Sequence, residues 1–226
     1  NNVDTTHDQR SGVVKRRDFI RMAVASGMAT TVSELPAKET PKSSPKVCTY
    51  TEHFQKLPIP QVCKVFKQIG VDGLDLTVRP GGHIDPKNVK EELPQAVKAA
   101  REQSLEIMML TTGITAPDRQ AEEIVATCQK LGIDRIKLGY FPVGKFGNLA
   151  KRLDEARRQL DAIVKLTTKY DVRPCVHVHS GNTIPSNGFM LHQLIREMPP
   201  DRIGAYLDSY HMTITGGNGG WRQAID

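Results

Sequence analysis

From Val47 onward, short apolar segments alternate with longer amphipathic segments at a spacing of about 30 residues. The apolar segments are typical of strands, and the amphipathic segments carry apolar residues at helical spacing. We predict strands at 47–54, 73–79, 106–114, 135–142, 174–178 and 203–207, and helices at 61–70, 88–104, 118–132, 148–170 and 188–198. Such strict alternation predicts an α/β fold with a parallel sheet that is buried on both faces.

The number of strand–helix units leaves two architectures open. About six units are present, whereas a closed (β/α)8 TIM barrel has eight strands and about 250 residues. The chain is therefore either an open doubly wound sheet or a barrel without its last quarter. Residues 221–226 are typical of the first turn of a sixth helix, which favours the incomplete barrel.

Polar residues gather where two neighbouring predicted strands end. The strand 174–178 runs into His177, His179 and Ser180, and the strand 203–207 runs into Asp208 and His211. Parallel strands place their carboxyl ends at one edge of the sheet, which is where α/β folds hold ligands. Imidazole and carboxylate groups are also the donors that bind divalent metals such as zinc. We therefore predict a site at this edge.

Composition and charge narrow the classes of partner. The chain has 226 residues, a length that suits one domain with a tail, and a net charge of +6. Half of this charge falls within the first 46 residues, and the remainder has no basic run, so we predict no nucleic-acid partner. No apolar run reaches about 18 residues, so no stable membrane insertion is predicted. The cysteines at 48, 63, 128 and 175 lack metal-ligand spacing, and we expect them to be buried free thiols.

Residues 1–46 have a different character from the rest. The segment KRRDFIR (15–21), followed by the small apolar run 22–32, resembles a twin-arginine export signal; the alternative is an ordinary basic tail. Residues 33–46 are typical of a linker. We therefore divide the chain into 1–46, an export signal and linker without fixed structure, and 47–226, a partial TIM-barrel domain. The signal predicts a periplasmic protein, whereas an ordinary tail predicts a cytoplasmic one.

Several segments resemble the sugar phosphate isomerase/epimerase branch of the xylose isomerase-like TIM-barrel superfamily. They are IGVDGLDLTVRPGGHIDP (69–86), TTGIT (111–115), CVHVHSGN (175–182) and IGAYLDSYHMTITGG (203–217), and with the helices between them they extend from Val47 to the end. The resemblance implies an eight-stranded barrel, one divalent metal ion (Mn, Mg, Co or Zn), and proton transfer on a sugar or keto-sugar. Many members also carry a twin-arginine leader.

The same resemblance implies roles for individual residues. Asp208 matches the metal carboxylate of the sixth strand, and His211 matches a histidine beside the metal that contacts substrate. The fifth strand usually offers Glu–x–His; here His177 takes the place of the glutamate, and we expect it to bind substrate while His179 binds metal. His83 matches a loop residue that faces substrate. A histidine and a glutamate from two further strands have no counterpart in this chain.

Three charged residues at strand ends are further candidates on their own chemistry. Arg79 either binds a substrate oxyanion or forms an ion pair, and Lys137 either points into the barrel as a proton-transfer group or extends to solvent. Glu52 is a candidate for substrate binding. Each histidine and Asp208 also has a structural alternative: a hydrogen-bonded core histidine, a solvated loop histidine, or a carboxylate that caps a turn.

These observations predict a metal-dependent isomerase or epimerase with a small carbohydrate substrate, namely a sugar, keto-sugar or cyclitol. Its catalytic groups would be His211 and Lys137. One alternative is a non-catalytic sugar-binding barrel with a decayed metal site, and another is a zinc endonuclease of the same superfamily that cuts abasic DNA. An incomplete barrel also exposes two sheet edges, and a homo-oligomer is one way to cover them.

Overall fold

The computed structural model describes residues 44–225. The export signal predicted at 15–32 lies outside these residues. In sequence order the elements are β1 (Cys48–Tyr50), η1 (Thr51–Phe54), α2 (Ile59–Ile69), β2 (Gly73–Val78), η2 (Pro86–Asn88), α3 (Val89–Glu102), β3 (Glu106–Thr112), α4 (Arg119–Leu131), β4 (Arg135–Lys137), β5 (Phe141–Pro142), α5 (Leu149–Thr168), β6 (Arg173–His177), β7 (Thr183–Ile184), α6 (Gly188–Ile195), β8 (Gly204–Tyr206) and α7 (Ser209–Ile225).

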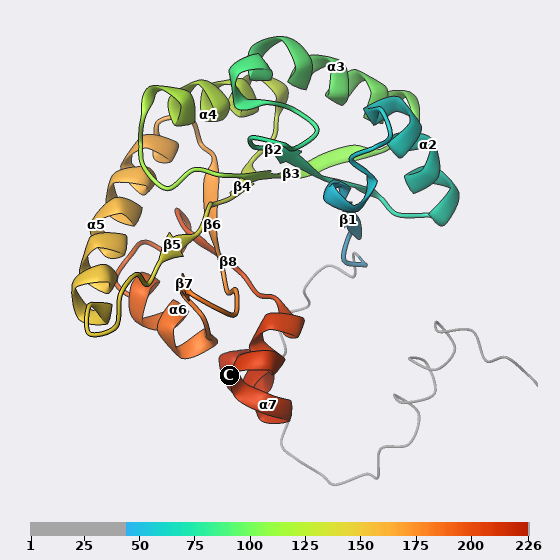
Figure 1. Ribbon diagram of the computed structural model, residues 1–226. Helices are drawn as coiled ribbons and strands as arrows, with labels where there is room; N and C mark the ends of the chain where they lie inside the picture. Colours follow the sequence, from blue (N-terminus) through green and yellow to red (C-terminus); the bar gives the residue numbers. More distant parts are fainter. Residues whose placement is uncertain (1–43, 226) are drawn as a thin grey trace, which may run out of the picture. The chain divides into compact units, whose positions relative to one another are not determined.

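Six strands form one parallel sheet in the order β1-β2-β3-β4-β6-β8, as the alternation predicted. Figure 1 shows the sheet curling, with α2, α3, α4, α5 and α6 along its outer side. A hydrogen bond proves the curvature: the Tyr206 hydroxyl donates to Asp75 Oδ2 at 3.4 Å, although β2 and β8 are not neighbours in the sheet. The two side chains therefore meet across the concave face. The fold is the predicted partial α/β barrel.

The helix ends follow local chemistry that can be seen in the sequence. Asp118 accepts a hydrogen bond from the backbone N–H of Ala121 at 2.8 Å and caps α4, and Asn187 caps α6 in the same way. Gly132 ends α4 with a left-handed φ of 76°, a conformation that glycine adopts without strain. The apolar faces of the helices pack on the sheet and form a core. It includes Phe66 of α2, Leu110 of β3 and Leu160 of α5.

Several local predictions were wrong. The first strand ends at Tyr50, so Glu52 lies on the 3-10 turn η1. The strand predicted at 135–142 divides into β4 and β5, and Gly139 lies between them, where a Cβ atom would be 2.6 Å from the Gly113 carbonyl oxygen. Cys48 is exposed, while the other three cysteines are buried and free.

Two helices contain residues that usually end or interrupt a helix. Pro94 lies inside α3, because the ring opposes only the carbonyl of residue 90, which is in the exposed first turn. The glycine-rich segment 216–220 falls within α7, which is interrupted at the non-helical Gly217.

A second, two-stranded sheet was not predicted. β5 and β7 pair antiparallel, with Phe141 opposite Ile184, and the Val143 N–H donates to the Asn182 carbonyl at 3.2 Å. This pair joins the segment that follows β4 to the segment that follows β6, at the carboxyl edge of the main sheet. Within residues 44–225, none of the helices combines the length and apolar character that a membrane crossing needs.

Candidate metal centre

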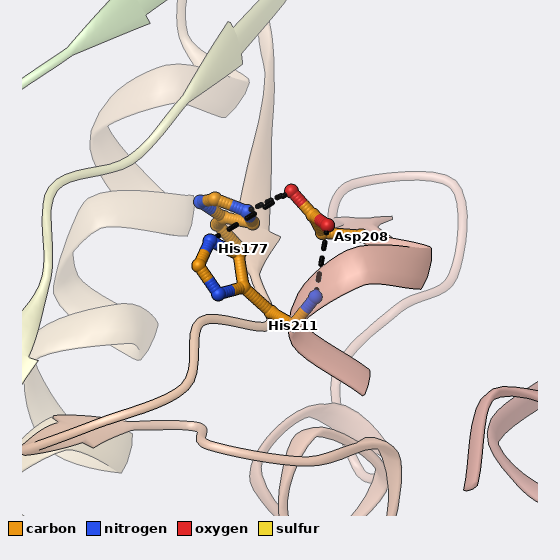
Figure 2. A group of neighbouring side chains, drawn as sticks. All are labelled: His177, Asp208 and His211. Carbon is orange, nitrogen blue, oxygen red and sulfur yellow. Dashed lines mark hydrogen bonds and ion pairs between the residues drawn. The ribbon is translucent and has the colours of Figure 1, made fainter. Parts of the chain in front are cut away.

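The carboxyl ends of β6 and β8 bring together the histidines and the aspartate that the sequence singled out. His177 is the last residue of β6, Asp208 directly precedes α7, and His211 lies in the first turn of that helix. Figure 2 shows the three side chains turned toward one another. Because β6 and β8 are hydrogen-bonded neighbours, with His177 opposite Tyr206, residues just past both strands converge.

The three side chains offer one ligand atom each to a common point. His177 Nε2 lies 3.3 Å from Asp208 Oδ2, and His211 Nε2 lies 4.0 Å from the same oxygen. All three atoms lie within 4.8 Å of one another, which is the spacing of groups that could share one ion. His177 is buried, and the other two are partly exposed, so the site has an open side.

The backbone fixes the orientation of the Asp208 carboxylate. Its Oδ1 accepts hydrogen bonds from the backbone N–H groups of Tyr210, at 2.9 Å, and His211, at 3.1 Å. This is a helix cap, the structural alternative that the sequence left open for Asp208. The cap uses only Oδ1, so Oδ2 remains directed at the two imidazoles. Capping and ligand binding are therefore compatible in this residue.

Each imidazole has a protein partner at its second ring nitrogen. The Tyr140 hydroxyl lies 3.3 Å from His177 Nδ1, and Ser180 Oγ lies 2.8 Å from His211 Nδ1. Sequence analysis named Ser180 among the polar residues of this edge but gave it no role, and it did not name Tyr140. Both follow the end of a strand by a few residues, like the histidines, but only the folded chain shows which ring nitrogen they contact.

The electrostatic environment favours neutral imidazoles beside a charged carboxylate. Burial, together with the positive charge of Lys137, lowers the pKa of His177 to about 4. Burial and the nearby His179 also lower the pKa of His211. Burial acts to raise the pKa of Asp208, but hydrogen bonds from the His211 backbone and from His177 bring it below its usual value. At neutral pH the site therefore offers two lone pairs and one negative charge, which suits a divalent cation.

His179 lies in the same cluster, but its Nδ1 atom faces a backbone carbonyl. Its ring centroid lies 3.8 Å from that of His211, and its Nδ1 donates to the Ser180 carbonyl at 2.7 Å. The ring thus packs beside the three converging side chains, and its role as a metal ligand stays a prediction.

Lys137 points into the barrel rather than to solvent. Its side chain is buried, and Nζ donates to the Tyr140 hydroxyl at 3.3 Å. Burial, reinforced by the charge of Arg79, lowers the pKa of Lys137 to about 8. The lysine therefore lies one side chain away from His177 and can exchange a proton near neutral pH.

The other sequence candidates make contacts within the protein. Arg79 forms an ion pair with Glu52, which was the alternative to its binding an oxyanion. His83 uses both ring nitrogens: Nε2 lies 3.2 Å from the Phe54 carbonyl, and Nδ1 lies 3.2 Å from Thr77 Oγ1. Because a carbonyl only accepts, Nε2 donates, and Nδ1 accepts from Thr77. The roles of these three residues toward substrate stay predictions.

Sequence analysis also missed Asp75, a carboxylate buried on the concave face of the sheet. Its Oδ1 accepts from Thr111 Oγ1 at 2.8 Å, and its Oδ2 accepts from Tyr206. Within GLDLTVR the residue lies in the middle of a strand whose described residues are all buried, a position at which the sequence pattern predicts an apolar side chain.

Comparison with solved structures supports the architecture. The chain is similar to 3-keto-D-glucoside 4-epimerase YcjR from E. coli, with 17% identity and a TM-score of 0.63 over 80% of this chain and 73% of that one. D-allulose 3-epimerase from Methylomonas sp. has 13% identity and a TM-score of 0.53 over 69% of this chain and 58% of its own. The IOLI protein, solved with a zinc atom, has 15% identity and a TM-score of 0.59 over 76% of this chain and 66% of its own.

At these identities the likeness concerns the fold alone, and the chain spans less than two thirds of the last two proteins. A search of curated protein sequences gave no match. The family profile for xylose isomerase-like TIM barrels matches residues 63–226, which is most of the sequence. This chain, with its curled parallel sheet and its polar cluster at the carboxyl edge, belongs to the xylose isomerase-like TIM barrel family.

Proposed function

We propose that the protein is an isomerase or epimerase that moves a proton on a carbon beside a carbonyl group of a sugar, keto-sugar or cyclitol. The observation that carries this proposal is the convergence of His177, Asp208 and His211 at the edge of the sheet where barrels of this type hold ligands. Family membership and the two epimerases among the similar structures support it.

The three converging side chains would hold one divalent metal ion. Such an ion, when bound, stabilises negative charge on neighbouring substrate oxygens as a Lewis acid. Two neutral imidazoles and a single carboxylate form a donor set that favours zinc or cobalt over the hard cation magnesium, which prefers oxygen ligands. In this arrangement His211 serves as a ligand, and proton transfer falls to another group.

We assign proton transfer to Lys137. Proton transfer is most efficient when the pKa of the transferring group lies near the working pH, and burial brings the pKa of Lys137 to about 8. Its contact with Tyr140 places it next to the metal-binding side chains without making it a ligand.

Two considerations favour an uncharged substrate. Arg79, a cation near the same edge, is already neutralised by Glu52, so it has little charge left for a phosphate. The proposed twin-arginine export would also carry the protein to the periplasm, away from phosphorylated sugars. Free keto-sugars and cyclitols are therefore the first substrates to test.

The test combines metal content with proton exchange. Purified protein is analysed by elemental mass spectrometry and then incubated with keto-sugars in D2O, and deuterium incorporation is followed by NMR. The wild type should bind about one metal equivalent and exchange a substrate proton. The Asp208→Asn variant should lose both, because asparagine can keep the α7 cap through its oxygen but lacks the negative charge.

The matched control is Asp171→Asn, which changes an exposed aspartate paired with Arg202 on the surface. It should bind metal and exchange protons as the wild type does. Full activity in Asp208→Asn would contradict the assignment of this centre. Metal and sugar binding without any exchange would instead support the non-catalytic sugar-binding barrel.

A further inference from the structure

In the imidazoles of His177 and His211 the two ring nitrogens, Nε2 and Nδ1, have different partners. In His177 the Nε2 atom faces Asp208 Oδ2, and the Nδ1 atom faces the Tyr140 hydroxyl. In His211 the Nε2 atom faces the same carboxylate oxygen, and the Nδ1 atom faces Ser180 Oγ. Both rings thus present Nε2 to the centre and have a hydroxyl behind Nδ1.

A neutral imidazole carries its single proton on one of these nitrogens. A ring that binds a metal through Nε2 must carry the proton on Nδ1, and it needs an acceptor there. The Tyr140 and Ser180 oxygens both have lone pairs for this purpose.

Neighbouring groups hold the two hydroxyl residues in place. The charged Lys137 ammonium donates to the Tyr140 oxygen at 3.3 Å and lies 4.3 Å from the centroid of the Tyr140 ring. The carbonyl of Ser180 accepts a hydrogen bond from His179 at 2.7 Å. Tyr140 and Ser180 are therefore held by their own contacts, as partners that orient a ligand should be.

From this geometry we infer that Tyr140 and Ser180 are positioning residues, which fix His177 and His211 as Nε2 ligands of the divalent metal. The inference rests on the metal centre of the proposed function and deepens it. It assigns to this site an outer layer of two hydroxyl groups, one for each imidazole. Removing either hydroxyl should weaken metal binding roughly 10- to 100-fold, the usual effect of losing such a partner.

A purely structural reading of the same contacts makes a different prediction. His177 Nε2 would then carry the proton and donate to Asp208, while the Tyr140 hydroxyl donates to Nδ1. In that case the hydroxyls stabilise the metal-free protein, and their removal lowers the melting temperature without a specific effect on the metal.

The experiment measures metal binding in Tyr140→Phe and Ser180→Ala. Zn²⁺ affinity is determined by competition with a chromophoric chelator, and the Co²⁺-loaded proteins are compared by visible absorption, which reports ligand geometry. Melting temperatures of the metal-free proteins are recorded alongside. Tyr170→Phe is the matched control, since that hydroxyl donates to Glu122 on the surface. Ser180→Thr, which keeps a hydroxyl, tests for rescue.

The inference predicts weaker Zn²⁺ binding and an altered Co²⁺ spectrum in both variants, with wild-type behaviour in Tyr170→Phe and recovery in Ser180→Thr. If the wild type binds metal and the two variants bind it equally well, the inference is wrong and the metal centre stands. If the wild type binds no metal, the centre itself is wrong, and the inference fails with it.

Discussion

His177 determines the charge of the candidate centre. Two neutral imidazoles and Asp208 give it a single negative charge, whereas a carboxylate at position 177 would add a second. Charge and oxygen donors are what hard cations such as Mg²⁺ and Mn²⁺ require, and neutral nitrogen donors favour zinc. The identity of this one residue therefore bears directly on which metal the proposed centre would select.

Replacing that histidine should change metal preference. In His177→Glu we expect the ratio of Mn²⁺ affinity to Zn²⁺ affinity to rise about tenfold, because an oxygen donor and a charge replace a neutral nitrogen. Titration of the metal-free protein with each ion measures the ratio. His192→Glu makes the same substitution on the exposed side of α6 and should leave the ratio unchanged. An unchanged ratio in His177→Glu would remove residue 177 from the centre.

At the scale of single residues, the sequence predicted which side chains come together but not which atom of each side chain contacts which partner. His177, His179, Asp208 and His211 follow two strand ends, and the parallel sheet makes them converge. The pairing of each ring nitrogen depends on side-chain directions, which no spacing rule supplies. For the same reason the sequence assigned no role to Ser180, although it lies at the predicted edge, and it did not indicate Tyr140, because a hydroxyl near a strand end is common in any α/β protein.

At the scale of elements, the loop that carries His83 is attached to the turn η1. The ring bridges Thr77 at the end of β2 and the Phe54 carbonyl in η1, and the Thr77 hydroxyl also lies 3.3 Å from that of Thr51. The sequence prediction of η1 as a continuing strand failed because this bridge, which joins residues 29 apart, lies beyond local patterns.

Removing the bridge should destabilise the fold and spare the metal centre. In His83→Phe the Phe54 carbonyl and the Thr77 hydroxyl each lose the hydrogen bond to the imidazole, so we expect the free energy of unfolding to fall by about 1–2 kcal/mol. Urea denaturation measures the loss, and Zn²⁺ titration should give the wild-type affinity. Unchanged stability combined with a raised KM for a substrate would instead support the substrate contact that the sequence resemblance implied.

The whole molecule has a polar interior on the concave side of its sheet. Asp75 and Lys137 are both buried there, in contrast to the apolar layer between the sheet and the helices. The alternation of strands and helices was sufficient to predict the parallel sheet. It left open whether Lys137 points inward and did not indicate Asp75, because a strand buried on both faces has no alternating pattern that would show which side holds the polar groups.

The buried carboxylate should make stability depend on pH. Burial raises the pKa of Asp75 from 3.8 to about 6, so the folded protein binds this proton more tightly than the unfolded chain does. Ionising Asp75 therefore costs stability, and the cost develops as the pH rises from about 4 to about 6 and then stays constant. The Asp75→Asn variant should be more stable than the wild type at pH 8, by on the order of 2 kcal/mol, and nearly equal to it at pH 4.

Thermal unfolding of both proteins across this pH range measures the difference. Asp171→Asn, at an exposed position, should follow the wild-type curve throughout. A wild type that is as stable as Asp75→Asn at pH 8 would mean that Lys137 and the hydrogen bonds from Thr111 and Tyr206 fully offset the cost of burying the charge.

The short β5–β7 sheet links two segments that the chain separates by about 40 residues. Tyr140 directly precedes β5, and Ser180 lies just before β7, so the residues behind the two imidazoles are attached to opposite sides of one ladder. The two loops are thereby coupled mechanically. An insertion or deletion in one of them would shift the hydroxyl carried by the other, and a designer who grafts this centre onto another barrel would have to transfer both loops as a single cassette.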